Sequence, residues 1–282
     1  MVKIGVVGNN VDAEFYEALF EQVENVQLAG IFDITKNQIE FADFLVSCQG
    51  IYITNKLLTP YDYIVKAFRQ GKHVFIKHIA ALSLEEISLL LENRKEANVK
   101  CMIACDKFCH ATALGLFEKI NTPFLFESIY NSFEQDKSII ELLIDELSVC
   151  MSLVQSDIKK INSVVAAVMK KETDYVNTRL EFSDGLIANI IIDTSSNTTS
   201  KKISLIAQQC RVEFNFENNY QSVIVPTSFG ILDETIRQIE SIQNEAKQLQ
   251  NFGESILGNA TPFMKLREGY KILEIALKIL KK

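Results

Sequence analysis

The sequence predicts an α/β protein in which a doubly wound parallel sheet is followed by a second, α+β domain. Up to about residue 118, apolar strand patterns alternate with helix patterns, and repeated strand–helix units of this length are typical of a parallel sheet with right-handed crossovers. After residue 118 the alternation stops. We therefore expect two domains, residues 1–118 and residues 119–282, each large enough to bury its own core.

The first domain opens with a strand at residues 2–8, VKIGVVG, whose continuous apolar character is typical of burial on both faces. A helix is predicted over residues 12–24, because apolar side chains recur there at helical spacing and Asp12 is a suitable N-cap. The second and third strands are predicted at residues 26–33 and 50–54.

A second helix is framed by capping signals at both ends. Thr59 and Asp62 form a Thr-x-x-acid box around Pro60, which suits the first helical position. Gly71 lies where a helix-terminating glycine is expected.

The next strand is KHVFI, residues 72–76. Ser83 and Glu86 form a capping box for a helix that ends near Ala97, and the fifth strand is predicted at residues 100–105.

The second domain begins with a long apolar helix at residues 138–154. Asp184-Gly185 is a strong hairpin signal. A polar loop follows at residues 194–202, and two helical patterns close the chain, the last starting at Thr261-Pro262. Strand-like runs occupy residues 163–169, 178–193 and 202–216.

The composition argues against two classes of partner. A net charge of −7 and a pI near 5.2 are unfavourable for nucleic acid or an anionic membrane surface, which need a basic stripe. No apolar run approaches the ~20 residues that span a bilayer. The N-terminal apolar run is too short for a signal peptide, so a cytoplasmic location is expected.

The six cysteines are expected to be reduced thiols that serve packing. Cys101, Cys105, Cys109 and His110 have a regular spacing, but the first two fall on a predicted strand. Residues four apart on a strand lie about 13 Å from each other, which is too far to share an ion. No metal site is predicted.

Four segments in the right order resemble the Gfo/Idh/MocA family, named after glucose–fructose oxidoreductase and inositol dehydrogenase. The N-terminal strand and turn are followed by AFRQGKHVFIKHIAALSLEE, RLEFSDGLIANIIID and FGESILGNATPFMKLREGYKILEIAL, so the resemblance runs nearly end to end. It implies an N-terminal Rossmann domain and a C-terminal domain with a large, mostly antiparallel sheet that makes a homodimer. It also implies an NAD(P)-dependent oxidoreductase acting on a sugar, polyol or similar carbonyl compound.

The resemblance places a dinucleotide-binding turn on Gly8, Asn9, Asn10 and Val11. Asn10 replaces the central glycine of the family, although asparagine tolerates a left-handed backbone, so the turn can survive. Asp12 adds a negative charge near the helix N-terminus that should hold phosphates.

Asp33, 25 residues after Gly8, matches the acidic residue that binds a ribose hydroxyl and favours NAD over NADP; capping of a following helix is the alternative. Thr54 and Asn55 complete the expected cofactor site. If the altered turn no longer binds a dinucleotide, the chain has no cofactor.

The resemblance also places two catalytic elements. The lysine of the family's Glu-Lys-Pro motif falls on His78, or on Lys77 if one residue is deleted. Successive strand side chains face opposite sides, so only one of the two should point toward the substrate. The family's Asp-x-x-x-His falls on Glu141 and Asp145, which share a helix face.

Two hypotheses follow. In the first, the chain is an oxidoreductase in which His78 relays a proton and Asp145 or Glu141 orients it. In the second, it is a catalytically inactive relative, a dimeric nucleotide- or ligand-binding protein that has kept the fold and lost the site.

Overall fold

The computed structural model describes residues 1–36, 40–54, 60–113, 120, 122–133, 137–154, 156–227, 232–238 and 244–281, with side chains left out at 110–113. The described chain forms two compact units. One comprises Met1–Cys109 with Gln243–Glu274, and the other comprises His110–Ile242 with Ile275–Lys282. The boundary expected near residue 118 lies outside the described residues. The segment Gln243–Glu274 thus returns to the first unit, which gives the chain an interleaved organisation.

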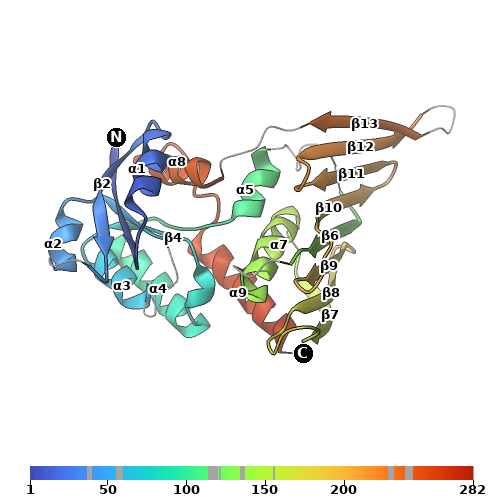
Figure 1. The fold of residues 1–282 in the computed structure, drawn as a ribbon, viewed down its shortest axis with the longest axis horizontal. Helices are drawn as coiled ribbons and strands as arrows, with labels where there is room; N and C mark the ends of the chain where they lie inside the picture. Colours follow the sequence, from blue (N-terminus) through green and yellow to red (C-terminus); the bar gives the residue numbers. More distant parts are fainter. Residues whose placement is uncertain are drawn as a thin grey trace. The chain divides into compact units, whose positions relative to one another are not determined.

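The first unit contains a five-stranded parallel sheet with the order β2-β1-β3-β4-β5 (Figure 1). Its order places β1 between β2 and β3, and the chain moves outward from β1 in both directions, as in a doubly wound sheet. The strands are β1 (Val2–Gly8), β2 (Val26–Asp33), β3 (Gly50–Ile53), β4 (His73–Ile76) and β5 (Cys101–Ile103).

Helices cover both faces of this sheet. Helices α1 (Ala13–Glu21) and α8 (Asn244–Leu257) pack on the face to which Val2, Ile4 and Val6 point. Gly5 points to the opposite face, where an added Cβ would meet Phe44 of α2 (Phe41–Val46). That face also carries α3 (Pro60–Arg69) and α4 (Leu84–Ala97), which pack against each other.

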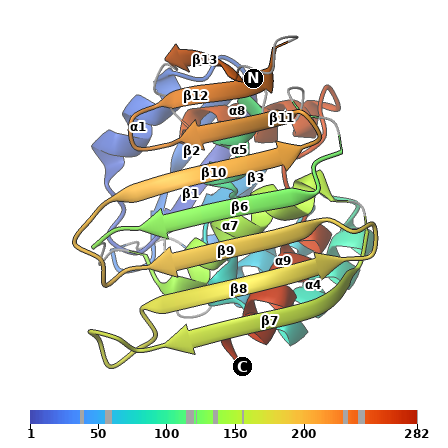
Figure 2. The ribbon, with the colours of Figure 1, turned by 90° about the vertical axis from the view of Figure 1, so that its right-hand side faces the viewer.

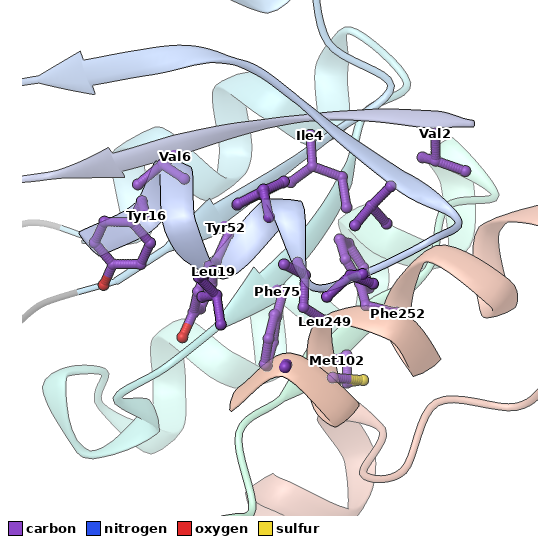
Figure 3. Packing of buried hydrophobic residues seen from close by; sticks show 14 residues of the cluster. Val2, Ile4, Val6, Tyr16, Leu19, Tyr52, Phe75, Met102, Leu249 and Phe252 are labelled. Carbon is purple, nitrogen blue, oxygen red and sulfur yellow. The ribbon is translucent and has the colours of Figure 1, made fainter. Parts of the chain in front are cut away.

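The core under α1 and α8 is rich in aromatic side chains (Figure 3). Tyr52 and Phe75, on adjacent strands, stack with ring centroids 4.4 Å apart, and Phe252 of α8 lies 5.6 Å from Phe75. Leu249 and Phe252 are completely buried. Burial at this density is what holds α8, distant in sequence, on the N-terminal sheet.

Local helix signals are confirmed where the structure describes them. The Asp12 carboxylate accepts a hydrogen bond from Phe15 N–H at 3.1 Å, and Ser83 and Glu86 form the predicted capping box. Pro60 is the first residue of α3, and Gly71 has φ +67° beyond its end. Thr59, the predicted cap of α3, lies outside the described residues.

The last helix, α9 (Leu266–Leu280), starts later than the sequence predicts. Residues 261–265 are not helical, and the last two of them pair with β5. Met264 C=O accepts a hydrogen bond from Ile103 N–H at 2.9 Å, and Lys265 forms a bridge with Met102. Pairing with the sheet therefore overrides the Thr-Pro start signal.

The second unit contains an eight-stranded sheet, drawn face-on in Figure 2, with the order β13-β12-β11-β10-β6-β9-β8-β7. Only the β6–β9 pair is parallel. The strands are β6 (Leu125–Asn131), β7 (Ile158–Ala166), β8 (Tyr175–Phe182), β9 (Ile187–Asp193), β10 (Ser200–Ala207), β11 (Cys210–Asn215), β12 (Tyr220–Pro226) and β13 (Leu232–Gln238).

Helix α7 (Ile139–Leu153) packs on one face of this sheet, and none of the described helices of the second unit crosses the near face in Figure 2. The hairpin at Asp184-Gly185 is confirmed, with Gly185 at φ +94°. The run at 202–216 is two strands joined by a turn at Gln209, and β10 begins inside the predicted loop at 194–202. Strands β6, β12 and β13 were not predicted. None of the described helices combines the length and apolar character needed to span a bilayer.

Candidate functional site at the carboxyl ends of the parallel strands

The carboxyl ends of the parallel strands bring the predicted site residues of the first unit to one edge. Gly8 ends β1, Asp33 ends β2, Thr54 follows β3, and Lys77 with His78 follows β4. Strands β1 and β3 are neighbours, so the strand order reverses direction there. Doubly wound sheets bind ligands at this edge and at this switch point.

The turn after β1 keeps a tight geometry despite the replaced glycine. Asn10 has φ +47°, in the left-handed region that asparagine tolerates, as the sequence predicts. Gly8 C=O accepts a hydrogen bond from Ile34 N–H at 2.9 Å, which ties the turn to the end of β2. Asparagine at this position is therefore compatible with a tight turn.

Asp33 closes this turn from the neighbouring strand. Its carboxylate oxygens accept hydrogen bonds from the backbone N–H groups of Asn10 at 3.1 Å and Val11 at 3.2 Å. Thr35 donates through its N–H at 3.0 Å and its hydroxyl at 2.6 Å, and Lys36 Nζ lies 3.4 Å away. Burial raises the pKa of the Asp33 carboxyl, but the hydrogen bonds from Thr35, Asn10 and Lys36 outweigh it and bring the pKa to about 2. The carboxylate is therefore ionised at neutral pH.

The capping alternative for Asp33 is wrong. Helix α2 begins at Phe41 with Glu40 as its N-cap residue, and the Asp33 side chain faces the turn after β1 instead. The Asp33 side chain turns toward the Asn10 and Val11 amides because its carboxylate satisfies these two hydrogen-bond donors.

Thr54 is buried behind the strand ends. Its hydroxyl donates to Val7 C=O at 3.3 Å and also hydrogen-bonds the Tyr16 hydroxyl. Tyr16 belongs to the first turn of α1 and lies under the same face of the sheet (Figure 3). Asn55, the other predicted residue after β3, lies outside the described residues.

Lys77 and His78 differ in their surroundings. Lys77 Nζ donates to both carboxylate oxygens of Glu245, at 2.9 Å each, and Tyr52 donates its hydroxyl to the same carboxylate at 2.5 Å. Lys77 therefore points to the face covered by α8. His78 is half-buried and precedes a short 3₁₀ turn, Ile79–Ala81.

The cluster of Tyr16, Tyr52, Lys77 and Glu245 was not predicted, because Glu245 lies far along the chain in a helix without a recognisable motif. Burial, with Glu245 nearby, raises the pKa of Tyr16 to about 12 and that of Tyr52 well above its usual range. Both tyrosines therefore stay protonated, and Tyr52 donates its hydroxyl to Glu245. The cluster fixes the orientation of the β4 end.

His73 has a structural role. His73 Nδ1 accepts a hydrogen bond from Lys100 N–H at 2.8 Å, and burial together with the nearby Lys100 charge lowers the pKa of the imidazole. His73 thus pairs the start of β4 with the chain entering β5.

In the second unit, Glu141 and Asp145 have separate partners. Glu141 closes a capping box at the start of α7, accepting from Ser138 N–H at 2.9 Å and from the Ser138 hydroxyl at 2.6 Å. Asp145 forms an ion pair with Lys137 at 2.9 Å. The helical spacing predicts two neighbouring carboxylates, and each is held by a different group.

One buried acidic residue of α7 was not predicted from the sequence. Glu146 is only 1% exposed and accepts a hydrogen bond from the hydroxyl of Ser128, a β6 residue that is also buried. The sequence did contain a signal for it, because Glu146 lies within an otherwise apolar helix pattern. Its pairing with Ser128 satisfies a polar group that is otherwise unfavourable in a core.

The thiols play a packing role. All six cysteines are free, and five are buried. Burial raises the pKa of Cys101 to about 12 and that of Cys109 to about 11, which keeps both sulfurs protonated. In the part of the chain that the structure describes, no three His, Cys, Asp or Glu side chains gather as a metal site requires.

The turn between β1 and α1 fits an anionic group. Two successive backbone N–H groups, those of Asn10 and Val11, converge on a carboxylate, and backbone amides in this arrangement bind anions such as phosphate. The residues present are thus compatible with a dinucleotide, provided that the Asp33 side chain leaves the amides.

The solved structures that resemble this chain agree on its fold. No family model matches the chain. Glucose-6-phosphate 3-dehydrogenase of Bacillus subtilis is 21% identical over 113 residues, a match that spans 36% of this chain and 32% of that enzyme. Among solved structures, UDP-N-acetylglucosamine 3-dehydrogenase GnnA from Acidithiobacillus ferrooxidans has a TM-score of 0.89 at 17% identity, covering 99% of this chain and 97% of its own.

Two further structures span nearly both chains. A dehydrogenase, MviM, from Clostridium difficile has a TM-score of 0.82 at 16% identity and covers 99% of each chain. The aldose-aldose oxidoreductase from Caulobacter crescentus has a TM-score of 0.78 at 15% identity and covers 99% of this chain and 96% of its own. At these identities the likeness establishes the two-domain fold.

Proposed function

We propose that this chain, which has the fold of the Gfo/Idh/MocA oxidoreductases, is an NAD(P)-dependent oxidoreductase acting on a sugar, a polyol or a related small carbonyl compound. The observation that carries the proposal is the anion-binding turn after β1, with an ionised Asp33 beside it at the switch point of the sheet. The sugar and nucleotide-sugar dehydrogenases among the matches support the substrate class.

The preferred cofactor is NAD. The proposed binding residues are Gly8, Asn9, Asn10, Val11, Asp33, Thr54 and Asn55. A carboxylate at the end of β2 can accept a hydrogen bond from a ribose hydroxyl, whereas the 2′-phosphate of NADP would meet its negative charge. When bound, the nicotinamide supplies hydride transfer, and the chain supplies binding, orientation and proton movement.

His78 is the proposed proton-transfer residue. The Lys77 ammonium is engaged by both oxygens of Glu245, which argues against Lys77 in this role. Imidazole exchanges protons near neutral pH and suits general acid–base work. Asp145 is the proposed orienting group. Its carboxylate pairs with the side chain of Lys137, whereas the Glu141 carboxylate caps the backbone at the start of α7.

A catalytically inactive, ligand-binding relative is the second candidate. It is favoured by the replacement of the central glycine with Asn10, by Asp145 at the family's histidine position, and by the occupation of the turn amides by Asp33. Such a protein binds a nucleotide without turning it over, or binds none.

Two further properties belong to the proposal. A homodimer through the open face of the eight-stranded sheet is supported by the uncovered face visible in Figure 2. A cytoplasmic location is supported by the six free thiols, which persist in a reducing compartment.

The proposal is tested by titrating the purified protein with NADH and NADPH and then screening polyols and keto sugars for turnover. We expect tighter binding of NADH, and a loss of turnover in His78→Ala. The matched control is His73→Asn, which removes a histidine from the same segment but keeps an acceptor for Lys100 N–H. Full turnover in His78→Ala would exclude His78 from the mechanism, and nucleotide binding without turnover of any substrate favours the inactive relative.

A further inference from the structure

The Asp33 carboxylate has no acceptor site left for a ligand. A carboxylate offers about four lone-pair sites. Oδ1 accepts three hydrogen bonds, from Asn10 N–H, Thr35 N–H and the Thr35 hydroxyl. Oδ2 accepts one from Val11 N–H and pairs with the Lys36 ammonium 3.4 Å away. The side chain is also only 10% exposed. Its role at the ribose therefore requires that it first give up these partners.

The same contacts occupy the turn. Hydrogen bonds to an ionised acceptor are stronger than those between neutral groups, so the amides of Asn10 and Val11 hold the carboxylate firmly. An incoming phosphate needs these N–H groups and competes with a negative charge that is already in place.

We propose that Asp33 is an internal anion that occupies the dinucleotide turn until the cofactor displaces it, and that this exchange determines which nucleotides bind. The inference rests on the proposed function and extends it. A diphosphate takes over the amides of the turn, and the displaced carboxylate then needs a new hydrogen-bond donor. The ribose diol of NAD provides that donor.

The exchange discriminates between three classes of ligand. Inorganic pyrophosphate fills the turn but offers the displaced carboxylate no donor in place of the two amides that it loses, so it binds weakly. NADP replaces one ribose hydroxyl by a phosphate that repels the carboxylate. Of the three, NAD alone provides both an acceptor for the turn amides and a donor for the displaced Asp33 carboxylate. The difference in affinity between NAD and NADP should therefore exceed the contribution of one ribose hydroxyl contact.

Variants of Asp33 and its neighbours test the exchange without any turnover. Asp33→Asn keeps the size of the side chain and removes the charge, and we expect it to bind pyrophosphate about tenfold more tightly than wild type, the effect of about one charge-assisted hydrogen bond. Thr35→Val removes the 2.6 Å bond but keeps the charge, and we expect it to bind NADH several-fold more tightly, on the same scale. Thr35 is exposed, so this variant should fold normally.

The matched control is Asp12→Asn. It removes one negative charge from the same end of α1 while asparagine still caps the helix, and it leaves the contacts of Asp33 unchanged. Binding is followed by calorimetry and by the backbone amide NMR signals of Asn10 and Val11. In wild type these two signals should barely respond to pyrophosphate, and in Asp33→Asn they should shift.

Three results would overturn the inference: equal pyrophosphate binding by wild type and Asp33→Asn, an equal gain in Asp12→Asn, or weaker NADH binding in Thr35→Val. Failure of the proposed function looks different. In that case the pyrophosphate results hold, but the protein binds neither dinucleotide or transfers no hydride to any substrate.

Discussion

At the end of β4, the ion pair between Lys77 and Glu245 distinguishes Lys77 from its neighbour His78. Lys77 and His78 are adjacent in sequence, and the resemblance to the Gfo/Idh/MocA family aligns the family's lysine with His78, or with Lys77 if one residue is deleted. Glu245 binds Lys77 with both oxygens, and Tyr52 adds a third hydrogen bond to the same carboxylate. Because both charges are partly shielded, with 27% of the lysine and 23% of the glutamate side chain exposed, the pair holds Lys77 on the α8 face.

Removal of one partner of this pair should destabilise the first unit. We expect Lys77→Met to lower the free energy of unfolding by about 1–2 kcal/mol, between the values typical of exposed and buried pairs, because Glu245 keeps a half-buried charge. The double variant Lys77→Met, Glu245→Gln should recover part of the loss. Urea denaturation measures both values, and a double variant less stable than the sum of the single ones would contradict the coupling.

Asp33 should give the protein a distinct response to acid. Its folded-state pKa, about 2, lies below the usual value of 3.8, so its contribution to stability is present above about pH 4 and is lost as the pH falls toward 2. We expect denaturation experiments between pH 5 and pH 2 to show a steeper loss of stability in wild type than in Asp33→Asn. Parallel curves for the two proteins would mean that the turn does not hold the carboxylate.

Among the elements, α8 depends most on a close approach to the sheet. A Cβ added at Gly253 would overlap Val26 Cγ1 of β2, so only glycine lets α8 lie this close. We expect Gly253→Ala to destabilise the protein by about 1–3 kcal/mol, although alanine favours a helix by ~1 kcal/mol. Lys247→Ala, on the exposed side of α8, is the control and should be neutral or slightly stabilising. The melting temperatures of the two variants distinguish the effect of packing from that of helix propensity. An unchanged melting temperature in Gly253→Ala would show that α8 can move away from β2 without a loss of stability.

Elements with local signals could be predicted, and elements defined by distant contacts could not. Asp12, Ser83 with Glu86, and the left-handed Asn10 act on backbone groups within a few residues, so the sequence displays them directly. The first turn of α9 was predicted too early because Met264 and Lys265 pair with β5, which no local pattern reveals. Tertiary pairing overrides capping propensity in such cases.

In the candidate site too, the sequence predicts some residues and not the distant residues that they contact. Residues at strand ends, such as Gly8, Asp33 and Lys77, follow from the alternation of strands and helices, because parallel strands meet at one edge. Their partners do not follow. Glu245 is 168 residues from Lys77 and reaches it only because α8 returns to the first unit. Which way the Asp33 side chain turns also depends on two backbone amides whose direction only the folded turn defines.

The open face of the eight-stranded sheet carries the last prediction, that of a homodimer. Val164, Asn177, Ile191 and Ile129 lie in cross-strand register over four adjacent strands, and Val164 and Ile129 are exposed. A dimer interface of standard size buries about 800 Å² on each partner, and a charge at its centre opposes association. We expect Ile129→Lys to convert a dimer into a monomer in sedimentation velocity experiments. Val168→Lys, in the exposed β7–β8 connection, is the control and should stay dimeric. A wild-type protein that sediments as a monomer at micromolar concentration would remove the open face as a dimer interface, while the same loss in Val168→Lys would place the interface at the β7–β8 edge.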